Sequence, residues 1–152
     1  MLDQTNGGIL ITKIKQLQGR IFEKLLTAHN ISEFNGAQGR ILFVLWEKDD
    51  IPISELAKQT GLAKTTLTSM LDRMEKQELI ERIYSPADRR TVRIRLTKTA
   101  SSFKEQYEQV SDEMNQIFYK GFSDEEILTL ETGLRKVLKN LTEKENYHEK
   151  EH

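Results

Sequence analysis

Apolar residues recur every three or four positions at both ends of the chain, which is the spacing of an amphipathic helix. This spacing predicts a long helix over residues 9–29 and another over 98–119 that Thr97 caps. A third helix should follow a capping box that starts at Ser123. The tail beyond Thr142 is polar and charged, so we expect it to fray.

The centre of the chain opens with a stretch at 37–48 that is rich in large apolar residues. Such a helix should be almost wholly buried, and we expect Trp46 to be a core residue rather than a platform for a ligand. Pro52 resists helix, so this helix ends before it. Ser54 is then placed to cap the next, shorter helix.

The segment from 53 to 77 has the spacing of a helix-turn-helix. Ala57 is small enough for two helices to cross, Gly61 permits a turn with positive φ, and Leu67 faces inward from the second helix. The second helix is expected over 64–77. Its inner face should pack in the core through Leu67, Met70, Leu71 and Met74.

After residue 79 the apolar period changes from the helical one to two, which indicates β-strands. Residues 80–84 form one predicted strand, 85–90 a turn and 91–96 the return strand. On the return strand Val92, Ile94 and Leu96 face inward and Thr91, Arg93 and Arg95 face outward. We therefore expect a mainly α protein with a small two-stranded β wing, a winged helix-turn-helix with helices at its N- and C-terminal ends.

The outer face of the second helix is polar and carries no carboxylate in its first two turns, which suits a DNA major groove. The residues expected to meet DNA there are Lys64, Thr65, Thr66, Thr68, Ser69 and Arg73. For Thr66, a base contact and a phosphate contact remain alternatives. Residues 58–98 contain ten basic and five acidic groups, although the whole chain has a net charge of −1. A basic patch on an otherwise acidic chain predicts a polyanionic partner, and a merely solvated charged face is the alternative.

The terminal helices, about 9–29 and 98–145, are too apolar to remain in water. Together they offer more large apolar side chains than a monomer can expose, at roughly 1.5–3 kcal/mol for each one buried. We expect a homodimer in which helices from both chain ends interlock. An intramolecular bundle is the alternative.

Other classes of function find little support in the sequence. The chain has no cysteine, so disulfides, thiolate metal sites and thiol-based redox sensing are excluded. The histidines, His29, His148 and His152, are scattered, and neither a metal-ligand spacing nor a catalytic motif is present. We therefore predict no enzymatic activity, no cofactor and no metal. No apolar run approaches a membrane span and no cleavable signal is visible, so a cytoplasmic protein is expected.

Two linked motifs carry a resemblance to a known family. One is the second-helix core Leu71-Asp72-Arg73-Met74-Glu75, and the other is a wing in which Asp88 and Arg90 precede a strand ending in Leu96-Thr97. In these motifs the chain resembles the MarR family of transcriptional regulators, and the resemblance covers nearly its whole length. It implies one MarR-like domain over 1–152, with the winged lobe at about 36–97.

The resemblance also implies roles for the wing. Arg90 matches the arginine that enters the minor groove, and Asp88 matches the partner that holds its guanidinium. Alternatively the pair only fastens the wing tip, and Arg89 enters the groove. The expected wing contacts are Asp88, Arg89, Arg90, Arg93 and Arg95. The chain departs from the family pattern at Glu78, where a glycine is common, so the second helix is expected to end differently, and at Ser69, where an arginine is common.

The resemblance implies a homodimeric repressor that binds double-stranded DNA at a pseudo-palindromic operator. It also implies release by a small anionic aromatic effector. The sequence does not assign the effector-binding residues, although Arg20, Lys24, His29 and Arg40 are basic groups near the expected junction. The competing interpretation is a winged-helix module that binds protein and not DNA.

Overall fold

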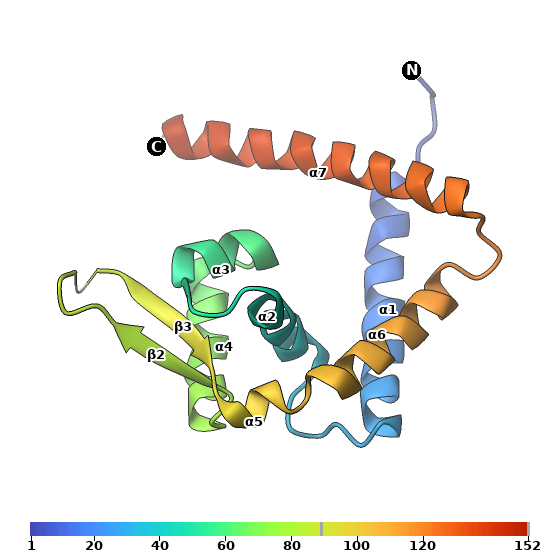
Figure 1. The fold of residues 1–152 in the computed structure, drawn as a ribbon. Coiled ribbons are helices and arrows are strands. Elements are labelled where there is room, and N and C mark those ends of the chain that lie inside the picture. Colours follow the sequence, from blue (N-terminus) through green and yellow to red (C-terminus); the bar gives the residue numbers. More distant parts are fainter. Residues whose placement is uncertain (89, 152) are drawn as a thin grey trace. The chain divides into compact units, whose positions relative to one another are not determined.

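The computed structural model describes residues 1–88 and 90–151, with side chains described as far as Tyr147. Arg89, one of the predicted wing contacts, and His152 lie outside the described residues. The chain divides into two compact units, Met1–Met114 and Asn115–His152. Figure 1 shows the ribbon and the element labels used below.

The first unit has mostly helical elements and one small sheet. Its elements in order are α1 (Gly7–Ala28), α2 (Gly36–Glu47), β1 (Ile51–Pro52), α3 (Ile53–Thr60), α4 (Lys64–Lys76), β2 (Ile80–Tyr84), β3 (Val92–Leu96), α5 (Lys98–Ser101) and α6 (Lys104–Phe118), of which α6 runs past the boundary of the unit. The mainly α winged-helix fold expected from the sequence is confirmed. In Figure 1 the β2–β3 hairpin projects beyond the helices of this unit.

The sheet has three strands in the order β1-β3-β2, so the predicted two-stranded wing is present as β2 and β3 but is joined by an edge strand that was not predicted. All pairs are antiparallel: Ile51 lies opposite Ile94, and Arg82 also lies opposite Ile94 on the other side of β3. The short β1 is an edge strand, where a residue without a backbone N–H such as Pro52 is tolerated. A two-residue strand has no periodicity of its own, which is why the pattern of the sequence did not reveal it.

The core lies where α2, α3 and α4 pack against the sheet. Within α2, Ile41, Leu42 and Leu45 are fully buried, but Phe43 is 40% exposed, so the prediction of an almost wholly buried helix was wrong. Trp46 is half-buried against this core, and its indole N–H donates to the carbonyl of Ala100 at 3.2 Å. Its role as a core residue is thereby confirmed.

Helix starts depart from expectation in two places. Pro52, not Ser54, occupies the N-cap of α3, because its extended backbone leads directly into the helix and no side chain caps it. Thr97 does cap α5 through the N–H of Ala100, as predicted, but the expected helix over 98–119 is interrupted after Ser101. The hydroxyl of Ser102 donates to the carbonyl of Thr99 at 2.6 Å, and such local bonds compete with helix continuation.

The second unit contains the end of α6 and helix α7 (Asp124–Glu151). The predicted capping box is present, since Ser123 Oγ accepts from the N–H of Glu126 at 3.2 Å and Glu126 Oε1 accepts from the N–H of Ser123 at 3.1 Å. The helix continues past Thr142, so the prediction of a frayed tail was wrong. Glutamate and lysine favour helix, and Lys144 Nζ lies 5.8 Å from the ring centroid of Tyr147. None of the described helices is long and apolar enough to cross a membrane.

Candidate nucleic-acid interface

The turn between α3 and α4 is the tight one that the sequence predicted. Gly61 has φ of +72°, a left-handed conformation that glycine adopts without a steric penalty. Its N–H donates to the carbonyl of Ala57 at 2.9 Å and closes the last turn of α3. Leu56 is fully buried and fixes α3 on the core. The geometry of this turn determines which face of α4 is presented to solvent.

Helix α4 separates its side chains into a buried face and an exposed face. The four predicted inner residues are all buried, from 0% exposure at Leu67 to 8% at Met70. The six predicted outer residues are all exposed, and their side chains make no hydrogen bond or ion pair with another described residue: Lys64, Thr65, Thr66, Thr68, Ser69 and Arg73. This row of polar side chains, which have no partner among the described residues, is available to bind another molecule.

The C-terminus of α4 ends with a left-handed residue despite the absence of glycine. Glu78 has φ of +60°, its N–H donates to the carbonyl of Glu75, and the N–H of Leu79 donates to the carbonyl of Met74. These two bonds make a Schellman motif, and the burial of Leu79 and Met74 supplies its usual apolar contact. The expectation that Glu78 would make the helix end differently was therefore wrong.

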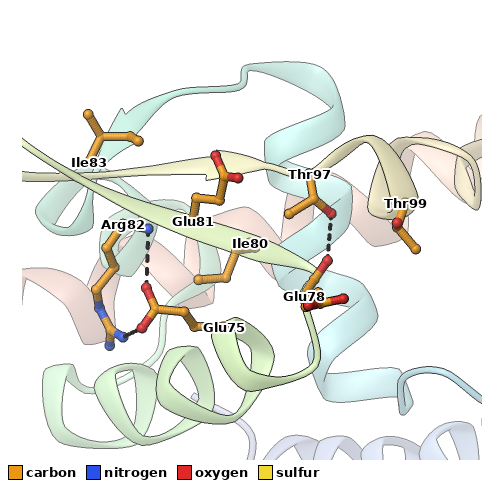
Figure 2. A pocket seen from close by; sticks show the side chains of 8 residues that line it. All are labelled: Glu75, Glu78, Ile80, Glu81, Arg82, Ile83, Thr97 and Thr99. Carbon is orange, nitrogen blue, oxygen red and sulfur yellow. Dashed lines mark hydrogen bonds and ion pairs between the residues drawn. The ribbon is translucent and has the colours of Figure 1, made fainter.

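A cation from the sheet holds α4 in place, and the sequence pattern did not reveal it. Arg82 on β2 places Nη2 2.8 Å from Oδ1 of Asp72 and Nη1 3.2 Å from Oε1 of Glu75, and the latter pair is drawn in Figure 2. Its side chain is only 11% exposed, and its backbone N–H also donates to Glu75. An i, i+3 pair of acids on the predicted helix followed by an arginine on the next strand was the signal that could have indicated this clamp.

A shallow groove lies beside β2, and Figure 2 shows the side chains that line it. Its lining is Glu75, Glu78, Ile80, Glu81, Arg82, Ile83, Thr97 and Thr99. The hydroxyl of Thr97 donates to the carbonyl of Glu78 at 2.7 Å and so ties the end of α4 to the start of α5. With three glutamates against one arginine, this groove does not suit a polyanion.

The wing tip is organised by Asp88, but through a different contact from the one the family resemblance implied. Asp88 Oδ1 accepts from the backbone N–H of Arg90 at 2.9 Å, and Oδ2 accepts from the hydroxyl of Thr91 at 3.1 Å. The carboxylate therefore fixes the backbone of the turn, whereas the guanidinium of Arg90 makes no ion pair with a described residue. Asp88 shapes the hairpin, and the Arg90 side chain remains available.

The two outward arginines of β3 already have acidic partners. Arg93 Nε lies 3.0 Å from Oδ1 of Asp50 and also donates to the Asp50 carbonyl, while Arg95 Nη2 lies 3.5 Å from Oε2 of Glu81. Both arginine side chains are about half exposed, at 45% and 48%. They could still bind phosphate, but only by sharing or breaking these pairs.

The four basic groups near the predicted effector junction are less distinctive. Arg20, Lys24 and Arg40 are exposed, and His29 Nε2 lies 2.8 Å from Oε2 of Glu113. Burial raises the pKa of Tyr107, and the nearby charge of Arg40 partly opposes this. Nothing among the described residues gathers the four groups around one cavity. No cluster of potential metal ligands occurs in the described part of the chain either.

Among the residues that the structure describes, the outer face of the helix-turn-helix and the Arg90 side chain of the projecting hairpin have no ion-pair partner, and this arrangement defines a winged-helix protein of the DNA-binding class. Comparison with known proteins agrees. The MarR family model matches residues 34–92. The multiple antibiotic resistance protein MarR of Escherichia coli is 32% identical over 132 residues, which cover 86% of this chain and 90% of that protein. The chain therefore belongs to the MarR family of DNA-binding transcriptional regulators.

Two further similarities extend this comparison. The HTH-type regulator YsmB of Bacillus subtilis is 39% identical over 93 residues, and the match covers 61% of this chain but only 64% of YsmB. Among solved structures, a mutant MarR of E. coli complexed with operator DNA has a TM-score of 0.76 and 28% identity. The superposition covers 90% of this chain and 99% of that one.

Proposed function

We propose that this protein is a homodimeric, sequence-specific repressor that binds a pseudo-palindromic DNA operator and is released by a small molecule. The observation that carries the proposal is the exposed outer face of α4, whose polar side chains have no partners among the described residues. The similarity to a MarR structure complexed with operator DNA also supports DNA binding. The chain is proposed to act as one domain over 1–152.

In this proposal α4 enters the major groove. Lys64, Thr65 and Thr68 lie near its N-terminal end, the end that helix-turn-helix proteins direct at base edges. A hydroxyl group donates a hydrogen bond to a base or accepts one from it, so it suits several bases. The Lys64 ammonium favours the acceptor atoms of guanine. The absence of an arginine at Ser69 removes a strong bidentate donor to guanine, so discrimination rests on several weaker contacts.

The wing is proposed to reach the adjacent minor groove through Arg90. A guanidinium without an ion pair loses no protein contact on entering a narrow A·T-rich groove, where the negative potential is greatest. Asp88 contributes by holding the turn from which Arg90 extends. Arg73, Arg89, Arg93 and Arg95 are proposed to contact phosphates and to supply salt-sensitive affinity.

Dimerisation is proposed because each unit exposes apolar stripes. In α1, Ile9, Leu10, Ile11, Ile14 and Leu17 are 44–53% exposed. In α7, Leu128, Leu138 and Leu141 are 64–65% exposed. Patches of this kind mark association surfaces. Two recognition helices about one helical turn of DNA apart would then read two half-sites.

Effector release is proposed to depend on a difference in ligand affinity between two states of the dimer. The two winged lobes of the dimer would have one spacing that fits DNA and another that does not. An anionic aromatic ligand would release DNA only if it bound the second spacing more tightly than the first. Calorimetric titration with aromatic carboxylates, coupled to a DNA-release assay, tests this. A set of such ligands that bind without changing DNA affinity would remove this element and leave the rest intact.

The central experiment selects bound sequences from random duplex DNA and then measures affinity by fluorescence anisotropy across a salt series. We expect a palindromic consensus and a steep loss of affinity with salt. Arg90→Ala should weaken binding by roughly 1–3 kcal/mol without dissociating the dimer. Arg135→Ala, which removes an exposed arginine from α7, is the matched control and should leave affinity unchanged. A protein with no salt-dependent affinity for any duplex would instead favour the protein-interaction module.

A further inference from the structure

Tyr84 is an exposed aromatic residue for which the proposed function has no role so far. It is the last residue of β2 and its side chain is 62% exposed. Its hydroxyl makes no hydrogen bond with any residue whose side chain the structure describes. Tyrosine is enriched at binding interfaces because its ring offers apolar contact area and its hydroxyl can form a hydrogen bond.

The pairing register shows which face of the sheet Tyr84 occupies. Tyr84 lies opposite Val92, and Arg82 lies opposite Ile94, which is fully buried. Because side chains alternate along a strand, Tyr84 and Arg82 share a face, and directly paired residues lie on the same side of the sheet. Tyr84 therefore belongs to the face of the sheet that packs against the helices, at the end where the hairpin projects beyond them (Figure 1).

The contacts of Arg82 then place Tyr84 along α4. Arg82 reaches the side chain of Asp72 and the carbonyl of Thr68, so β2 runs back along α4 toward its N-terminus. Two strand residues advance about 6.6 Å, which corresponds to roughly four helix residues. Tyr84 accordingly lies level with the first two turns of α4, where Lys64 and Thr65 are exposed.

This position is between the two parts of the proposed DNA interface. On one side is the N-terminal half of α4, proposed for the major groove, and on the other is the wing tip with Arg90, proposed for the adjacent minor groove. The sugar-phosphate strand that separates two adjacent grooves has to pass between those two parts.

We propose that the Tyr84 hydroxyl donates a hydrogen bond to a phosphate of this strand, with its ring packed on the neighbouring deoxyribose. The inference rests on the proposed function and adds one DNA contact to it. A neutral donor fits here because the nearest cation on the same face of β2, Arg82, is already paired to Asp72. Phosphate contacts fix the register of the protein on the duplex and carry no sequence information.

The test compares Tyr84→Phe with Tyr147→Phe, which deletes the same atom from α7. Affinity is measured by anisotropy on the selected operator and on a scrambled duplex, each over a salt series. We expect Tyr84→Phe to weaken both complexes by about tenfold to a hundredfold, as loss of a hydrogen bond to a charged group does. The salt slope should stay unchanged because a phenol releases no counterion. Tyr147→Phe should remain within about twofold of the wild type.

A methylphosphonate scan of the operator locates the contact. If Tyr84 donates to a phosphate, one neutral linkage in each half-site should cost the wild type more than it costs Tyr84→Phe. This local non-additivity separates a direct contact from a general loss of stability. A Tyr84→Phe variant that binds as tightly as the wild type, or equal penalties at every linkage, overturns the inference while the proposed function stands. A wild-type protein that binds no duplex at all overturns both.

Discussion

Replacing Glu78 by glycine should make the protein more stable, although it removes a side chain from a helix terminus. Glu78 has φ of +60° at the end of α4, with its side chain exposed. Its backbone is held there by the two bonds of the Schellman motif and by the hydroxyl of Thr97, which donates to its carbonyl. None of these three bonds depends on the Glu78 side chain.

The size of the effect is a difference between two opposing terms. A left-handed conformation costs an L-residue roughly 1–2 kcal/mol, which glycine avoids. Glycine also gains more freedom in the unfolded chain, which offsets roughly 0.5–1 kcal/mol of this benefit. We expect Glu78→Gly to raise the free energy of unfolding by about 0.5–1 kcal/mol. For a chain of this length this corresponds to about 1–4 °C in Tm.

Urea unfolding at one fixed protein concentration measures the change, because association would otherwise shift the apparent stability. Trp46 is the only tryptophan and reports unfolding of the lobe by its fluorescence. Glu78→Ala is the matched control, since it removes the same charge but keeps a Cβ and therefore the strained φ. Equal stabilisation by alanine and glycine would show that relief of charge repulsion with neighbouring glutamates, and not backbone strain, explains the gain.

Three further predictions concern packing and charge in the lobe. A Cβ on Gly39 would lie 2.6 Å from Cε2 of the buried Tyr107 ring, so Gly39→Ala should lower the free energy of unfolding, measured in urea, by about 1–3 kcal/mol. A Cβ on Gly19 would meet nothing within 4 Å, so Gly19→Ala should raise the free energy of unfolding. Arg82→Gln should lower the free energy of unfolding by about 1–2 kcal/mol because it leaves two carboxylates without their cation, whereas the exposed and longer pair of Arg95 predicts at most about 0.5 kcal/mol for Arg95→Gln. Burial raises the pKa of Tyr107, so the folded state keeps a proton that the unfolded chain releases above about pH 10. Stability should be complete below that pH and fall above it, and a titration of Tyr107→Phe that shows the same alkaline decline would contradict this cause.

Local sequence rules predicted α4 and its neighbouring elements well, because each of these rules depends on residues that are close together in the sequence. The inward positions of α4 follow from helical spacing. Gly61 marks the turn because glycine adopts a positive φ without a steric penalty. The strand Ile80–Tyr84 was predicted with its observed bounds, because alternation is strongest where one face of a strand is buried. The roles of the side chains in DNA binding stay predictions.

Features that depend on contacts between distant segments were missed. The pairing of Ile51 with Ile94 joins residues far apart in sequence, and a two-residue strand leaves no pattern to detect. Asp50 has φ of +55°, and its carboxylate pairs with Arg93, which is equally far away in the sequence. A family resemblance likewise suggested a partner for the Arg90 guanidinium, whereas the geometry gives the Asp88 carboxylate to the backbone. Such contacts follow from tertiary packing, which overrides local preference.

The distribution of ion pairs changes the meaning of the basic patch counted along the sequence. Arg82, Arg93 and Arg95 each have acidic partners, so much of the charge between residues 58 and 98 is already compensated within the lobe. The cations without an ion pair among the described residues include Lys64 and Arg73 on α4 and Arg90 at the wing tip. Three of the proposed DNA contacts are thus among the unpaired cations, while the paired arginines stabilise the sheet that carries the wing. A paired arginine has to exchange a carboxylate for a phosphate when it binds DNA. Arg93 and Arg95 should therefore add less to the salt dependence of DNA binding than the unpaired Arg73 does.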